Sequence, residues 1–251
     1  MENKKGSGVF LGVVSVATLI VAIIGATFAF FSTQTGSAND AINTTAYEFA
    51  TKVTSVERIY PTTDDEAKFT QGIIPLNATK KITETETTYL MRAIANDKKC
   101  IDEKGYMVCV LYKVTLTNSS TLAAEMNLSV KTITNTAATG SGRTPFKDLT
   151  FQALSSTDGN AFTLNGQAAT LLETADQSVT IKADESNDLT ITAEAATDAS
   201  TPKETVHYFV IYLNEADAEA DQSSQMGAKF TGQLEYTTTT GGNRLTGTFT
   251  A

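Results

Sequence analysis

Apolar and polar residues alternate with a period of two in ten separate stretches of this chain, and this pattern constrains its fold more than any other feature. Alternation at that period sends successive side chains to opposite faces of a strand, as in a sheet with one buried face. Threonine recurs in these stretches, and a β-branched polar residue suits the solvent face. The stretches span residues 46–56, 89–95, 107–117, 125–132, 149–154, 178–182, 188–193, 206–213, 228–237 and 244–250.

Short turn-forming sequences separate the ten predicted strands. The clearest of them, Gly241-Gly242-Asn243, joins the last two strands and predicts a terminal β-hairpin. The sequence therefore predicts an all-β fold, a two-sheet antiparallel sandwich that is jelly-roll-like. Helix is expected only in residues 214–226 and in a turn near 62–68. The linker-like stretch 134–144 is short, so we expect it to be a surface loop of a single β-sandwich domain, residues 31–251.

An unbroken, uncharged and mostly apolar run covers residues 9–31, behind a short head with two lysines. A helix of this length spans the roughly 30 Å hydrocarbon core of a bilayer, and the positive head stays on the cytoplasmic side. Residues 1–30 are thus predicted to form an N-terminal hydrophobic helix that is either a signal peptide, cleaved near Ala29, Phe30 and Phe31, or a retained membrane anchor. Either way the protein is expected to be extracellular or on the cell surface, and to contact the membrane only through this segment.

The end of the apolar run, GATFAFFS at residues 25–32, resembles the ending of signal peptides processed by the signal peptidase SipW. The known clients of that peptidase are the matrix-fibre protein TasA and the camelysin-like proteins of Gram-positive bacteria. Residues 112–130, YKVTLTNSSTLAAEMNLSV, are similar to a strand–turn–strand element of the same proteins. The resemblance implies a secreted protein of the extracellular matrix, a subunit of biofilm-type fibres, with the signal peptidase as its partner during export.

The two cysteines, Cys100 and Cys109, flank a turn-forming Asp-Glu-Lys-Gly run, so we expect them to face each other across a hairpin. In an exported protein such a pair is typical of a disulfide that closes a small loop. A redox site would favour C-x-x-C spacing, and a zinc site would need further cysteine or histidine ligands. The sequence therefore predicts a structural disulfide.

The sequence predicts no catalytic residue, no cofactor and no metal site. His207 is the only histidine, and it lies inside a strand pattern, where a packed or rim position is expected. Camelysins are described as metalloproteases, but zinc peptidases of the H-E-x-x-H type need two histidines one helical turn apart. No Gly-x-Ser-x-Gly elbow frames a serine. The acidic runs 64–66, 184–188 and 217–221 lack EF-hand spacing, so solvated loops are expected there, with weak calcium binding as the alternative.

The segment behind the apolar run is the predicted functional site. Residues 31–56 begin with a polar stretch and enter an alternating strand in which Tyr47, Phe49 and Val53 share one face. In exported sandwich subunits such a strand can complete the sheet of a neighbour, and a head-to-tail contact of this kind propagates into a filament. The TasA-like resemblance implies the same here. The expected partner is a second copy of this chain.

A second interpretation of the same residues is that 46–56 is simply the first strand of a monomeric sandwich. The protein would then be a membrane-anchored binding module or adhesin, whose threonine-rich face contacts a matrix or surface ligand. A camelysin-like metalloprotease is disfavoured. Nucleic acid is excluded as a partner by the net charge of −9, because its binding requires clustered basic residues.

Overall fold

The computed structural model describes residues 50–62, 72–76, 85–95, 99–198, 200–214, 222–240 and 242–251. All of them belong to one compact unit, Phe49–Ala251. Several predicted features lie outside the described residues: the signal or anchor segment, its cleavage region at Ala29, Phe30 and Phe31, and the candidate donor residues Tyr47 and Phe49. Among the described residues, no helix has the length and apolar character needed to cross a membrane.

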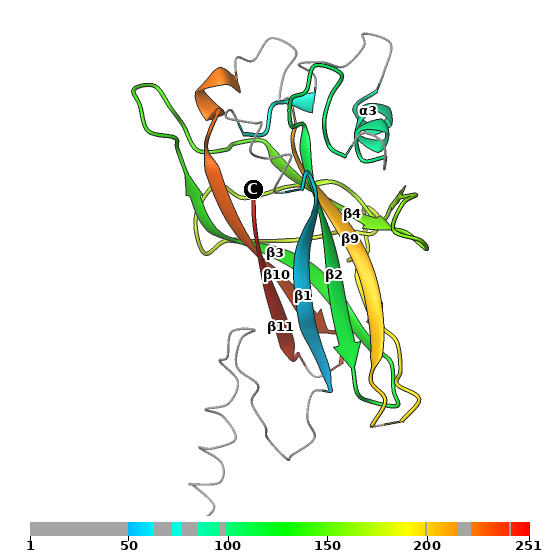
Figure 1. Cartoon of the computed structure of the whole chain (residues 1–251). Helices are drawn as coiled ribbons and strands as arrows, with labels where there is room; N and C mark the ends of the chain where they lie inside the picture. Colours follow the sequence, from blue (N-terminus) through cyan, green and yellow to red (C-terminus); the bar gives the residue numbers. More distant parts are fainter. Residues whose placement is uncertain are drawn as a thin grey trace, which may run out of the picture. The chain divides into compact units, whose positions relative to one another are not determined.

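The predicted all-β fold with two antiparallel sheets is confirmed. The larger sheet, called sheet A, has the strand order β1-β2-β9-β4-β5, with β6 beside β4. Its strands are β1 (Thr51–Tyr60), β2 (Cys109–Asn118), β9 (Lys203–Leu213), β4 (Leu149–Ser155), β5 (Thr163–Leu164) and β6 (Ala169–Thr170). Strand β9 comes late in the chain but lies between β2 and β4, so sheet A joins distant parts of the sequence (Figure 1).

The smaller sheet, called sheet B, has the strand order β11-β10-β3-β7, with β8 also paired to β3. Its strands are β11 (Arg244–Thr250), β10 (Lys229–Thr238), β3 (Ala124–Thr136), β7 (Ser178–Thr180) and β8 (Thr190–Ala193). The predicted terminal hairpin is confirmed, because β10 and β11 pair in register with Tyr236 opposite Leu245. Buried and partly exposed residues alternate along β3, as expected for a strand with one face in the core.

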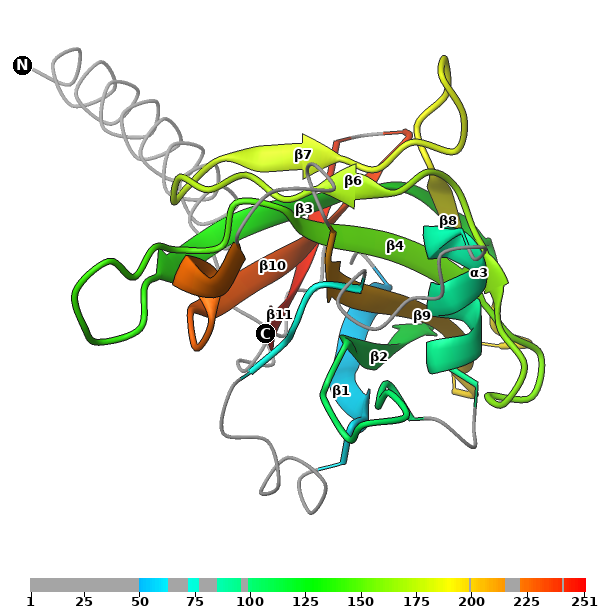
Figure 2. The same ribbon diagram turned by 90° about the horizontal axis from the view of Figure 1, so that it is seen from above.

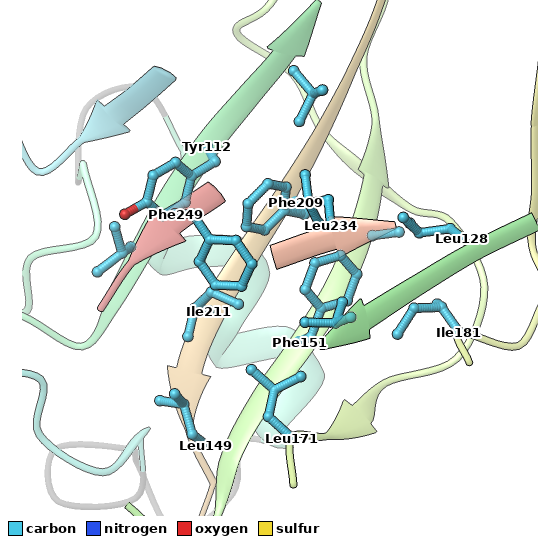
Figure 3. Close-up of a cluster of buried hydrophobic side chains, with 14 of the residues drawn as sticks. Tyr112, Leu128, Leu149, Phe151, Leu171, Ile181, Phe209, Ile211, Leu234 and Phe249 are labelled. Atoms are coloured by element: carbon cyan, nitrogen blue, oxygen red, sulfur yellow. The ribbon is translucent and has the colours of Figure 1, made fainter. Parts of the chain in front are cut away.

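The main hydrophobic core lies between the two sheets (Figure 3). Phe209 of β9 is at its centre and is fully buried. Its ring stacks on those of Tyr112 and Phe151, with centroids 4.9 Å away in both cases, and meets Phe249 of β11 edge-on at 5.0 Å. Offset and edge-on aromatic pairs of this kind add to the gain from burying their area. This aromatic group joins sheet A to sheet B.

A second cluster covers part of the outer face of sheet A, so most of β2 and β4 and the second half of β9 are buried on both faces. Helix α3 (Glu86–Ala93) lies over sheet A (Figure 2), and its Tyr89 and Leu90 belong to the same buried cluster as Leu111 of β2 and Val210 of β9. The prediction of a strand over residues 89–95 was wrong. The buried positions follow the helical spacing of one face, and Thr85 caps the helix by accepting from the backbone N–H of Thr88.

The loop that follows β3 is tied to the short 3-10 helix η2 (Gln222–Gln225). The backbone N–H of Thr144 donates to the carbonyl oxygen of Ser224 at 2.9 Å, and Arg143 Nη1 donates to that of Ser223 at 2.7 Å. Within the described residues, η2 is all that represents the predicted helix over residues 214–226. Most of the predicted turn near 62–68 lies outside them.

Candidate functional site

The cysteine pair lies beneath the α3 layer. Cys100 and Cys109 are fully buried, lie at disulfide-bonding distance and have Cα atoms 4.9 Å apart. Between them, Asp102 Oδ1 accepts from the backbone N–H groups of Lys104 at 2.9 Å and Tyr106 at 2.6 Å, which closes the predicted turn. The bond therefore fixes the chain after α3 to the start of β2, which is a structural role.

Removing this bond is expected to destabilise the fold without unfolding it. A loop closed by residues nine apart in sequence corresponds to about 2.5 kcal/mol in the chain-entropy model. The variant Cys100→Ala/Cys109→Ala should therefore lower the free energy of unfolding by about 2–3 kcal/mol, as measured by urea denaturation. A loss below about 0.5 kcal/mol would show that the α3 layer holds its place without the bond.

His207 lies on the inner face of β9 and is almost completely buried. Its Nε2 atom and the hydroxyl oxygen of Tyr236, from β10 in sheet B, are 2.7 Å apart. Its Nδ1 atom has no hydrogen-bond partner among the described residues. Burial lowers the pKa of His207 to about 4 and raises the pKa of Tyr236 well above its usual range. The pair is thus a neutral bridge between the sheets, and His207 is a packed residue.

Several of the acidic side chains that the structure describes serve turns and ion pairs. Asp184 accepts from the side chain and backbone N–H of Asn187 and from the backbone N–H of Ser186, and these bonds lower the pKa of its carboxyl group. Asp188 pairs with Lys182 at 2.5 Å. No three His, Cys, Asp or Glu side chains gather at one point in the described part of the chain. The acidic runs 64–66 and 217–221 lie outside it.

Strand β1 is the edge strand of sheet A and carries Val53, the one candidate donor residue that the structure describes. It pairs with β2, and register shifts between Val53 and Ser55 and between Arg58 and Tyr60 interrupt the ladder. Lys52 is exposed, while Val53 is partly buried and packs against the main core of its own chain. In this structure, then, β1 belongs to the chain's own sandwich and is the first strand of the described residues.

The outer edge of β1 lies beside β11, the edge strand of sheet B (Figure 1). No ladder joins the two strands in the described residues, and they meet through side chains. A Cβ atom at Gly247 would lie 2.7 Å from Cγ2 of Val56 and 3.0 Å from Cγ1 of Val53, so only glycine permits this approach. We call this contact the β1–β11 seam. In an edge strand, half of the backbone N–H and C=O groups point away from the neighbouring strand of the sheet. The β1–β11 seam brings two such strand edges together.

Sequence reasoning missed the contacts by which β2 holds both β1 and β11. The hydroxyl groups of Thr54 and Thr117 are hydrogen bonded to each other across the β1–β2 pair, and the hydroxyl of Tyr112 donates to the carbonyl oxygen of Thr250. These contacts join residues more than 60 positions apart. Gly247 looked like one residue of an ordinary strand, although a glycine inside a strand pattern is a known signal of close approach.

Comparison with known proteins does not assign a function to any of these features. No protein-family model matches this chain, and no curated protein gives a significant match.

Proposed function

We propose that this chain is a structural protein of the bacterial surface or extracellular matrix, a TasA-like fibre subunit that assembles head-to-tail by donating its N-terminal strand. It is exported by way of its N-terminal apolar segment and performs no catalysis. The single observation that best supports this proposal is the position of β1, which is at once N-terminal in sequence and at the edge of sheet A. A terminal edge strand is the part of a sandwich that can leave with least disturbance to the rest.

Exchange of β1 between copies costs little contact energy because the closed subunit and the fibre contain the same contacts. In the closed subunit β1 pairs with β2 of its own chain, and in the fibre it would pair with β2 of the next chain. The ladder and the packing of Val53 and Val56 over Gly247 are then conserved, as in domain swapping. Because each chain both gives and receives a strand, the contact does not close on itself and a filament results. We further propose the jelly-roll class of sandwich, since the chain crosses repeatedly between its two sheets.

A cross-linking experiment tests this proposal. In the variant Thr54→Cys/Thr117→Cys, the new cysteines replace hydroxyl groups that touch across the β1–β2 pair. Oxidation before assembly should lock β1 in its own sheet and abolish filaments, as seen by negative-stain electron microscopy. Oxidation after assembly should instead join successive chains into a covalent ladder on a non-reducing gel. The single-cysteine variants are the controls.

Two outcomes would contradict strand donation. Oxidised monomers that still form filaments would show that β1 stays in place, and filaments whose cross-links are all within one chain would show the same. A second variant, deletion of residues 31–56, should also abolish filaments, while a chain that keeps them would exclude this segment from assembly.

A monomeric surface binding module is the second candidate, and the closed arrangement of β1 favours it. The outer face of sheet B offers a polar surface for such a role. The strands that form it contribute exposed or partly exposed residues, namely Thr248 and Thr250 of β11, Ser129 of β3, Ser178 and Thr180 of β7, and Thr190 and Thr192 of β8. In this case the oxidised cysteine variant and the wild-type protein would both remain monomeric.

A further inference from the structure

The hydrogen bond between His207 and Tyr236 lies inside the β1–β11 seam, at the same level of the sandwich. In sheet A, Val56 of β1 pairs with Val114 of β2, which pairs in turn with His207 of β9. In sheet B, Leu245 of β11 pairs with Tyr236 of β10. Since Val56 is also one of the residues that meet β11 in the seam, the buried Val114 is what separates the seam from the histidine in sheet A.

The seam is the side of the sandwich on which the two sheets can part most easily. On the opposite side a backbone bond joins them, because the N–H of Gln167, beside β6, donates to the carbonyl oxygen of Lys182, just after β7, at 2.7 Å. At the seam the described strands share no ladder, and two register shifts interrupt the pairing of β1 with β2. The bond from the hydroxyl of Tyr112 to the carbonyl oxygen of Thr250 crosses it. Local opening is favoured where few hydrogen bonds must break.

The core around His207 offers nothing that would stabilise a positive charge on its ring. The residue is 6 % exposed, and its Nδ1 atom has no hydrogen-bond partner among the described residues. Tyr236 is the titratable group that faces it, and burial keeps that hydroxyl neutral. Strands β4 and β8 carry no charged residue. The charged residues of the other strands packed around it lie on outer faces or at an exposed strand end, namely Lys113, Glu125, Lys131, Lys203, Glu204, Lys229 and Glu235. A protonated ring would therefore need water.

We propose that protonation of His207 opens the β1–β11 seam and thereby releases β1 for donation to a second copy of this chain. The charged ring is hydrated when the sheets part beside it, and the seam is the side on which they part. A histidine that is neutral in the closed form and charged in the open form shifts the balance toward the open form as the pH falls. The release of β1 rests on the proposed function, whereas the opening itself does not.

Hydrogen–deuterium exchange of the full chain, followed by mass spectrometry, tests this proposal. If His207 regains its ordinary pKa of 6.5 in the open form, against about 4 in the closed form, opening should become about 30-fold more frequent between pH 7.5 and pH 5. The protection factors of the β1 amides, corrected for the intrinsic exchange rate, should fall by this factor. In His207→Gln they should change less than threefold. The amides of β4 are the internal control and should stay better protected than those of β1 at both pH values.

Three results would overturn the proposal. They are equal protection of β1 and β4 at both pH values, a β1 protection factor that does not change with pH, and the same change in His207→Gln as in the wild type. The first two need the wild-type protein alone, so the proposal stays testable even if the variant folds poorly.

Negative-stain electron microscopy of the same samples separates this proposal from strand donation. Filaments should form faster at pH 5 than at pH 7.5 in the wild type, but not in His207→Gln. Acid-dependent opening of β1 without filaments at either pH would contradict strand donation and leave the opening of the seam intact. Filaments at both pH values with unchanged protection of β1 would contradict the role of His207 and leave strand donation intact.

Discussion

Lowering the pH from 7 to 4 is expected to reduce the free energy of unfolding by about 3 kcal/mol through His207 alone. In the unfolded chain this histidine has its ordinary pKa of 6.5, whereas burial lowers it to about 4 in the folded protein. Between pH 4 and pH 6.5, His207 binds a proton in the unfolded state but not in the folded state. Each pH unit in that interval costs about 1.4 kcal/mol, so stability is lost as the pH falls from 6.5 to 4 and is constant above that window.

The variant His207→Gln isolates this contribution. Glutamine retains a polar group for Tyr236 but does not titrate, so the difference in unfolding free energy between the two proteins should shrink by about 3 kcal/mol between pH 7 and pH 4. Urea denaturation at several pH values measures it, and carboxylate protonation is common to both proteins and cancels. Two parallel stability curves would contradict the prediction. Because the chain has one histidine, NMR titration of its ring gives the folded pKa directly.

Phe209→Ala is expected to have the largest effect of any single substitution discussed here, a loss of about 3–5 kcal/mol in unfolding free energy. The residue is fully buried and contacts three aromatic rings, from β2, β4 and β11, so truncation leaves a cavity that rigid strands cannot fill. Urea denaturation should show the loss as a lower midpoint with an unchanged slope.

Two controls accompany this variant. Phe209→Leu keeps most of the volume and should cost less than half as much as the alanine substitution. Val206→Ala lies on the same strand but on the exposed outer face, at 38 % exposure, and should change stability by no more than about 0.5 kcal/mol. An alanine variant at position 209 within 1 kcal/mol of wild type would mean that the sheets do not pack around this side chain.

The sequence was informative where one physical rule decided the structure. Period-two alternation located nine of the eleven strands in the described part of the chain, because a strand with one buried face repeats every two residues. It did not find β5 and β6, since two residues are too few to show a period. Residues 89–95 were misread because an apolar group that includes Tyr89, Leu90 and Met91 fits either period, although Thr85 offered a cap signal for a helix.

Contacts between distant residues could not be predicted in this way. The β1–β11 seam depends on Gly247 lying under Val53 and Val56, almost 200 positions earlier in the chain. The partnership of His207 with Tyr236 depends on which faces of two different sheets oppose each other. Likewise, Asp148, just before β4, meets Asn214, just after β9, and Gln222 of η2. Such arrangements follow from topology, and local periodicity carries no information about them.

The place of β9 in sheet A has a consequence for how the chain reaches its native state. This strand separates β2 from β4, yet it is made roughly 50 residues after β4. Until it arrives, sheet A has no centre, and Phe209 is missing from the core. A chain that emerges from its N-terminus must therefore wait for β9 before the β1–β2 pair can join the group of β4, β5 and β6, and contacts of such long sequence separation make folding slow. The hairpin of β10 and β11, being local, can form at once and await the rest.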